Sequence, residues 1–192
     1  CTAYGCPAHC KTSDGRCDKC GPDYLGASRQ FMAAYEADPH FFEAYFNEGM
    51  SLERLGEYDK AIEAYEQYLK LFPQKKEKCA EVFFQIAVIY EQTGKDRAAF
   101  DTYKDYIKKW GKVGRMDRLL ESHVKIGRIY WGNRKYRDAI SEFNRVLKIY
   151  EGLRENQRNE LDTGADAAAQ ALFYLGEAKL LDFEKIKLKL PE

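Results

Sequence analysis

The sequence predicts an all-α fold, a solenoid of helix hairpins with about three complete repeats, a partial repeat at each end and a small irregular module at the N-terminus. Two observations lead to this prediction. A block of aromatic, small and proline markers recurs along the chain, with Pro39 and Pro73 separated by 34 residues, and such a fixed period is the signature of repeat architectures. In addition, five of the six cysteines lie within the first 20 residues, which marks that segment as a separate module.

The composition is that of an ordinary globular protein. The 192 residues are 45% hydrophobic and 32% charged, and 31 basic residues balance 31 acidic ones. No apolar run approaches the roughly 20 residues that a membrane-spanning helix needs, and the zero net charge argues against a dedicated nucleic-acid-binding protein. The charge is unevenly distributed, because residues 95–148 contain 15 basic and 7 acidic residues.

Residues 1–22 form the first predicted domain, a cysteine-rich module. They contain glycine and proline but no hydrophobic period, so they cannot bury a core and need covalent or metal staples to be ordered. The Cys17-x2-Cys20 pair followed by glycine resembles a zinc-ribbon knuckle, whereas the whole cysteine string resembles the small disulfide-bonded modules of extracellular proteins. We favour two disulfides over a zinc site. The cysteines concerned are Cys6, Cys10, Cys17 and Cys20.

The chain begins at Cys1 and not at methionine. In this it resembles a mature bacterial lipoprotein, in which signal-peptide removal leaves a cysteine that carries the lipid anchor. The resemblance implies membrane attachment through Cys1 and an exported, oxidising location in the cell envelope. The alternative is a segment boundary that happens to fall at a cysteine.

Residues 23–192 form the second predicted domain, which contains the repeats. Its first segment, residues 23–39, matches only the second half of the segment that follows it. The matching positions are Tyr24, Ala27, Phe31 and Pro39 against Tyr58, Ala61, Tyr65 and Pro73. We therefore expect a half repeat of one helix, with the cysteine-rich module in the place of its partner helix as a cap on the solenoid end.

Residues 42–73 contain the fullest copy of the repeat. The markers are Tyr45, Gly49, Leu52, Gly56, Tyr58, Ala61, Tyr65 and Pro73. This pattern resembles the tetratricopeptide repeat (TPR), a pair of antiparallel helices. The chemistry agrees with the resemblance, because small residues such as Gly49 and Ala61 let two helices approach closely and Gly56 suits the left-handed residue that ends a helix.

Further copies of the repeat follow at residues 80–111 and 120–150, with Ala87 and Gly127 at the small position of the first helix. After these, residues 167–192 contain a first helix, from about Ala167, but no complete second helix. We expect sequence beyond residue 192 to complete this partial repeat.

The TPR resemblance also implies a binding surface. A stack of TPRs presents its first helices on a concave face, where the family binds peptides or helices of partner proteins. Aromatic and amide groups on such a face suit an extended peptide, and tryptophan and arginine are enriched at interface hot spots. We therefore predict partner binding with Trp131 and Arg128 as the main contacts. The full predicted set is Asn47, Phe84, Lys125, Arg128 and Trp131.

Catalysis is poorly supported, because His9, His40 and His123 lie far apart in the sequence and belong to no nucleophile, metalloprotease or phosphate-loop motif. We predict a noncatalytic scaffold, without metal or cofactor, that binds a partner protein and no nucleic acid in a bacterial cell-envelope assembly, periplasmic or associated with the outer membrane. Two alternatives stay open: an intracellular, cytoplasmic TPR adaptor that contains zinc, and a thiol-redox protein that uses Cys17 and Cys20.

Overall fold

The computed structural model describes residues 16–17, 21–22, 24–37 and 41–184. The chain divides into two compact units, Cys1–Lys75 and Lys76–Glu192, and each is considered by itself. The boundary expected at residue 22, between the cysteine-rich module and the repeats, stays a prediction because most of that module lies outside the described residues. The same holds for the roles expected of Cys1, Cys6, Cys10 and Cys20, and only the backbone of Cys17 is described.

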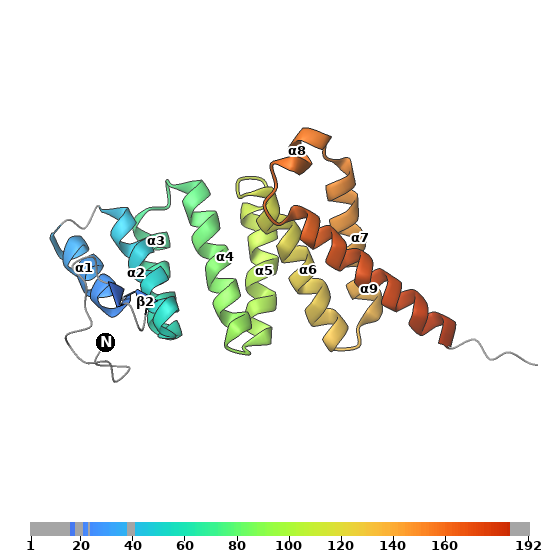
Figure 1. Ribbon diagram of the computed structural model, residues 1–192, viewed down its shortest axis with the longest axis horizontal. Helices are drawn as coiled ribbons and strands as arrows, with labels where there is room; N and C mark the ends of the chain where they lie inside the picture. Colours follow the sequence, from blue (N-terminus) through green and yellow to red (C-terminus); the bar gives the residue numbers. More distant parts are fainter. Residues whose placement is uncertain (1–15, 18–20, 23, 38–40, 185–192) are drawn as a thin grey trace, which may run out of the picture. The chain divides into compact units, whose positions relative to one another are not determined.

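The described residues of the first unit form a two-residue strand pair and three helices (Figure 1). Strands β1 (Arg16–Cys17) and β2 (Gly21–Pro22) are antiparallel, with Cys17 opposite Gly21. Helix α1 (Tyr24–Ala37) packs on α2 (Phe42–Leu55), and α2 forms a hairpin with α3 (Tyr58–Leu71). Gly56 ends α2 with a φ of 78°, the left-handed conformation that glycine adopts without strain.

In the second unit, the described residues 76–184 form two helix hairpins followed by a short helix and a long one (Figure 1). The hairpins are α4 (Lys76–Gln92) with α5 (Asp96–Trp110) and α6 (Met116–Gly132) with α7 (Tyr136–Gly152). A short α8 (Glu155–Asn159) leads to α9 (Gly164–Glu184), which packs against both α7 and α6. The predicted fold class, an all-α stack of helix hairpins, is confirmed.

The observed helices differ from the expected repeat limits at their starts. Helices α4 and α6 begin at Lys76 and Met116, about one turn before residues 80 and 120, and α9 begins at Gly164 rather than near residue 167. Asp and Glu side chains follow each of these starts, as Glu77, Asp117 and Asp166. Their negative charge favours a helix N-terminus, so the extra turn is stable although it lies outside the repeat pattern.

Close helix packing depends on the small residues that the repeat pattern places on the first helices. At Gly127 of α6, a methyl group would lie 2.6 Å from the ring of Phe143 on α7. At Gly49 of α2, a methyl group would overlap the ring of Tyr65 on α3 in the same way. In both hairpins the aromatic residue of the second helix therefore sits directly on the glycine of the first.

The turn between α6 and α7 departs from the pattern of the earlier hairpins. Where Gly94 ends α4 with a φ of 69°, the third hairpin has Arg134 with a φ of 59°. A side chain in this left-handed region costs roughly 1–2 kcal/mol. The turn nevertheless closes in the same way, because the amide of Lys135 donates to the carbonyl of Tyr130 at 2.9 Å.

The core of the second unit consists of two clusters that share α6. One lies among α4, α5 and α6 and includes Phe84, Tyr103 and Tyr106, all at most 2% exposed. The other lies among α6, α7 and α9 and includes Leu120 and Phe143. Because α6 contributes to both clusters, it is the element that ties the unit together and positions the polar groups described next.

Candidate functional site

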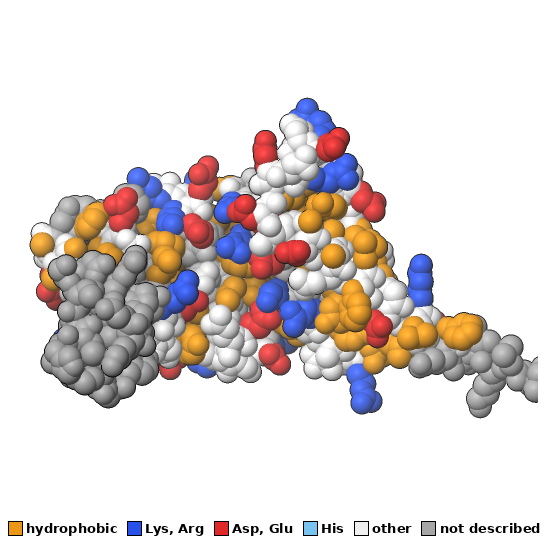
Figure 2. Space-filling view, viewed as in Figure 1, with side chains coloured by type: hydrophobic (Ala, Val, Ile, Leu, Met, Phe, Trp, Pro, Cys, Tyr) orange, Lys and Arg blue, Asp and Glu red, His pale blue; other side chains and the backbone are white. Residues whose placement is uncertain are grey.

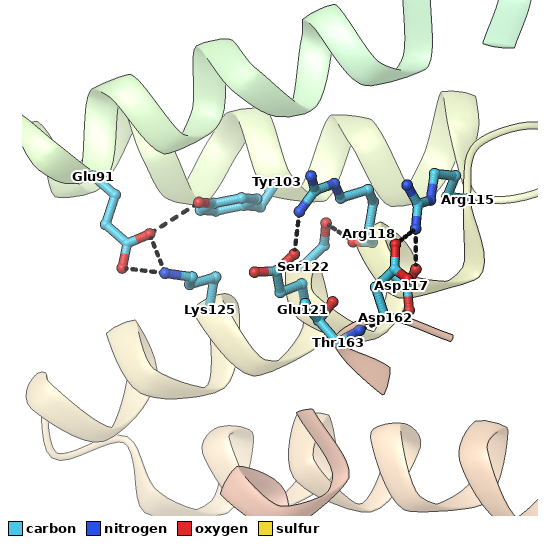
Figure 3. A network of polar contacts seen from close by, with 10 residues as sticks. All are labelled: Glu91, Tyr103, Arg115, Asp117, Arg118, Glu121, Ser122, Lys125, Asp162 and Thr163. Carbon is cyan, nitrogen blue, oxygen red and sulfur yellow. Dashed lines mark hydrogen bonds and ion pairs between the residues drawn. The ribbon is translucent and has the colours of Figure 1, made fainter. Parts of the chain in front are cut away.

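A polar face forms where side chains of the first helices α4 and α6 meet in the second unit (Figure 3). We call it the first-helix face. Its charged residues are Glu91 on α4 and Arg118, Glu121, Lys125 and Arg128 on α6. The central contact is an ion pair between α6 and α4, in which the Nζ of Lys125 lies 2.9 Å from one carboxylate oxygen of Glu91 and 3.1 Å from the other.

The carboxylate of Glu91 has a second partner beneath the surface. Tyr103 on α5 is fully buried, and its hydroxyl donates to Glu91 at 2.9 Å. Burial, with the negative charge of Glu91 as a smaller cause, raises the pKa of Tyr103 far above its usual value, so the phenol stays protonated and remains a donor. Glu91 is therefore oriented by a buried hydroxyl and presents its negative charge to Lys125.

Next to this pair, Arg118 covers the aromatic core. Its guanidinium lies 4.7 Å from the centroid of the Phe84 ring and donates to Glu121 at 2.8 Å. The charge thus stacks on the ring face, an arrangement that cations and aromatic rings favour. Phe84 itself is only 2% exposed. The prediction that Phe84 contacts a partner is therefore corrected, because its ring is enclosed by Tyr103, Tyr106 and Arg118.

A cavity of about 470 Å³ opens at the end of the first-helix face, next to Arg118. Its wall combines Lys78 and Glu81 of α4, which form an ion pair at 2.9 Å, with Arg115 and the buried Tyr106. Burial raises the pKa of Tyr106 to about 12, so this phenol is neutral at physiological pH. The wall of the cavity therefore contains an ion pair and a neutral hydroxyl group.

Arg115 and Asp117, at the start of α6, hold the segment that leads into α9 (Figure 3). Arg115 donates to Asp117 at 2.7 Å and also to Asp162. These two carboxylates raise the pKa of Arg115, and the nearly buried Asp117 also accepts from the backbone N–H of Thr163 at 3.4 Å. This cluster fixes the loop before α9, so its role is structural.

Lys125 and Arg128 both lie on the first-helix face, as predicted for partner contacts. They differ in their surroundings. Lys125 is largely covered and paired with Glu91, whereas Arg128 is exposed and makes no ion pair with any other described residue. Asn47 lies in the other unit, on α2, where its backbone carbonyl accepts from the hydroxyl of Ser51 at 2.8 Å. Partner contact by these three residues stays a prediction.

Trp131 on α6 is partly buried among aromatic rings. Its ring centroid lies 4.9 Å from that of Tyr136, 5.3 Å from Tyr174 and 6.5 Å from Phe143. These contacts join α6 to α7 and α9, so the indole contributes to the packing of the unit. A contact with a partner could use only the part of the ring that remains exposed.

Glu91 and Tyr103 were not predicted as site residues, although the sequence contains a signal for this pair. Two hairpins repeat one hydrogen bond between residues 12 positions apart: Tyr103 to Glu91 at 2.9 Å, and Tyr65 to Glu53 at 3.3 Å. The third hairpin places Trp131 and Phe143 at the same spacing, with their rings in contact. The third hairpin therefore has an aromatic pair at the positions where the other two have a glutamate–tyrosine hydrogen bond.

Within residues 16–17, 21–22, 24–37 and 41–184, no three His, Cys, Asp or Glu side chains gather as a metal site would require, and no helix has the length and apolar character to cross a membrane. The thiol of Cys79 is buried in α4, and this burial raises its pKa. His123 is also buried and lies 2.6 Å from Glu142 of α7, as a core residue.

Among solved structures, the fold is similar to that of BtubC from P. vanneervenii, with a TM-score of 0.57 and 18% identity over 88% of this chain and 78% of that chain. It is also similar to MamA from Desulfovibrio magneticus RS-1, with a TM-score of 0.54 and 12% identity over 86% of this chain and 89% of that chain. At these identities the likeness concerns the fold alone.

The sequence comparisons identify the family. The photosystem I assembly protein Ycf3 of Synechococcus sp. (strain CC9605) is 31% identical over 65 residues, which cover 34% of this chain and 37% of that protein. Models of the tetratricopeptide repeat match residues 42–75, 81–112 and 120–152. Each matched segment coincides with one helix hairpin, α2 with α3, α4 with α5, and α6 with α7. The chain is therefore a tetratricopeptide repeat protein, with the protein-interaction scaffold that such repeats form.

Proposed function

We propose that the chain is a noncatalytic scaffold that binds an acidic segment of a partner protein on the first-helix face of the second unit. The observation that supports this proposal most strongly is the position of Arg128. Its guanidinium is exposed and has no ion-pair partner among the described residues, whereas the neighbouring Lys125 and Arg118 are paired with Glu91 and Glu121. A carboxylate of the partner supplies the missing charge.

The rest of the face suits an extended segment that carries hydrogen-bond acceptors and donors side by side. The Lys125–Glu91 pair offers one donor and one acceptor side by side, and both side chains retain some exposure, 22% and 28%. The Tyr103 hydroxyl holds Glu91 in place before a partner arrives. Such preorganisation reduces the conformational entropy lost on binding. The first-helix face has three basic residues, Arg118, Lys125 and Arg128, and two acidic ones, Glu91 and Glu121, and this positive excess favours an acidic segment.

The proposal is tested with the full chain as bait in an extract of the cells that encode it. Arg128→Glu should reduce capture of the partner at least about tenfold, because arginine hot spots contribute roughly 2 kcal/mol or more to binding. The matched control is Arg137→Glu, the same charge change at an exposed site on the second helix α7. Capture is quantified by mass spectrometry.

Both variants should melt at the temperature of the unaltered chain, because neither arginine is buried. The expected result is a protein that the Arg137→Glu bait captures and the Arg128→Glu bait does not. Its binding to the unaltered bait should weaken as the salt concentration increases. Equal capture of every bound protein by the three baits would contradict the proposal.

We further propose that this scaffold works in the oxidising compartment of a bacterial cell envelope. The support is the clustering of five of the six cysteines in the first 20 residues, together with the burial of Cys79, the sixth. Clustered cysteines in a short segment without a core are typical of disulfide-stapled modules in oxidising compartments.

Thiol labelling of the protein isolated from its own cells, denatured but not reduced, tests this location. Disulfides among Cys6, Cys10, Cys17 and Cys20 should leave these four cysteines unreactive, whereas Cys79 should react once the chain is denatured. Four further reactive thiols, with one zinc ion per chain in the native protein, would instead identify the intracellular zinc-containing adaptor.

A further inference from the structure

The cavity beside Arg118 lies at one end of the first-helix face, within the second unit. The N-terminal ends of α4 and α6 and the C-terminal end of α5 are found at this edge of the unit (Figure 1). The volume of about 470 Å³ is within the range of small-ligand pockets, so the cavity has room for the end of a long side chain. The charged residues of its wall are Glu77, Lys78, Glu81, Arg115 and Arg118.

The charges around this cavity do not balance. Every cation of the wall already has at least one carboxylate partner. The pairs are Lys78 with Glu81, Arg118 with Glu121, and Arg115 with both Asp117 and Asp162. Glu77, in contrast, is exposed and makes no ion pair with another described residue. The wall and its ion-pair partners thus combine three cations with five carboxylates. A group that enters the cavity therefore meets an excess of negative charge.

Tyr106 adds a neutral acceptor behind the wall of the cavity. Its side chain is fully buried, and its hydroxyl has no hydrogen-bond partner among the described residues. The oxygen lies directly against Gly114 of the wall, where a methyl group would overlap it. A phenol can accept a hydrogen bond as well as donate one, whereas ammonium and guanidinium groups only donate. The hydroxyl and the carboxylates therefore both favour a cation in the cavity.

We propose that the cavity binds a lysine or arginine side chain of the partner segment whose acidic residue binds Arg128. This inference rests on the proposed function, because it extends the same segment along the first-helix face. Basic and acidic side chains lie close together over α4, α5 and α6 (Figure 2). The Lys125–Glu91 and Arg118–Glu121 pairs cancel their own charges. The unpaired cation at one end of the face and the acidic cavity at the other then bind the segment in one direction.

Helix geometry determines how far apart the two charges of the partner segment lie. Arg128 and Arg118 are ten positions apart on α6, which corresponds to about 15 Å at about 1.5 Å per residue. An extended segment advances about 3.3 Å per residue. Acidic and basic residues four or five positions apart can therefore reach both ends of the face, whereas a spacing of two positions covers only about 7 Å.

Four synthetic peptides test the proposal against the full chain. All are glycine–serine peptides with blocked ends, so that they carry no terminal charge. The first contains an aspartate and a lysine five positions apart. The second replaces the lysine with uncharged norleucine, the third replaces the aspartate with asparagine, and the fourth brings aspartate and lysine to within two positions. Backbone amide shifts in NMR spectra measure binding, because they detect dissociation constants into the millimolar range.

The first peptide should bind about fivefold more tightly than the norleucine peptide, the upper range for an ion pair at a partly exposed site. Glu77→Gln should remove this difference and leave the binding of the norleucine peptide unchanged. The matched control is Glu151→Gln, the same change at an exposed position of α7, which should keep the difference. The amide of Gly114 should shift with the first peptide and not with the norleucine peptide.

Equal binding of the lysine and norleucine peptides, with Arg128→Glu still weakening both, would overturn this inference and leave the proposed function intact. A lysine advantage that is equal at both spacings, or that Glu77→Gln retains, would indicate non-specific attraction and would also overturn it. If the asparagine peptide binds as tightly as the first peptide, the proposed function is contradicted, whereas a lysine advantage that depends on Glu77 still supports the cavity as the site of a basic side chain. The absence of shifts with every peptide at millimolar concentration would overturn both.

Discussion

Replacing Phe84 with alanine is expected to lower the free energy of unfolding by about 3–5 kcal/mol, as for other buried phenylalanines. The ring is 2% exposed, lies 5.8 Å from Tyr103 and 5.5 Å from Tyr106 between ring centroids, and supports the guanidinium of Arg118. Its removal leaves a cavity at the junction of α4, α5 and α6 that these bulky neighbours cannot fill.

Chemical denaturation followed by circular dichroism measures this effect. The matched control is Phe173→Ala, which removes the same ring from a site that is 62% exposed. This variant should change stability by no more than about 0.5 kcal/mol. Similar stability of both variants, with loss of partner binding in Phe84→Ala, would instead restore Phe84 to the partner-binding residues.

The second large effect concerns Glu48, a buried residue of α2. Burial raises the pKa of this carboxyl from 4.5 to about 7. A carboxyl whose pKa is higher in the folded than in the unfolded state stabilises the fold below the unfolded pKa, and this contribution is lost as pH rises through the folded pKa. The chain should therefore lose up to about 3 kcal/mol between pH 4.5 and pH 8 from Glu48 alone.

Glu48→Gln removes the titration and keeps the shape of the side chain. The variant should be as stable as the unaltered chain near pH 4.5 and up to about 3 kcal/mol more stable at pH 8. Glu63→Gln, at an exposed position on α3, is the matched control and should follow the unaltered chain throughout. Melting temperatures measured from pH 4.5 to 8 provide the comparison. A constant difference between Glu48→Gln and the unaltered chain would contradict the pKa that burial implies.

The helix hairpins could be predicted from residue types and their spacing along the chain. Small residues such as Gly127 and large ones such as Phe143 recur at set positions, and these determine which helix faces meet because packing between adjacent helices is a contact between nearby parts of the chain. The left-handed turn at Gly94 follows in the same way from one residue. The turn at Arg134 lacks the glycine, but backbone hydrogen bonds of the neighbouring residues close it.

The candidate site followed from the sequence only in part. Arg128 and Lys125 were placed on the correct helix, because helical spacing alone assigns residues to a face. The same spacing cannot show how deep a side chain lies, and so Phe84 was assigned to the surface although three neighbours enclose it. Depth depends on the sizes of side chains from other helices.

The sequence by itself determined the family, the hairpins and the helix faces, since all three depend on residue type and spacing within about 34 positions. Only the tertiary structure decided which charges are satisfied. Lys125 is paired because Glu91 and the buried Tyr103 come from two other helices, and Arg128, one turn further along α6, has no such partner among the described residues. It also decided that α9 packs on both α6 and α7, because such contacts join parts of the chain that are far apart in the sequence.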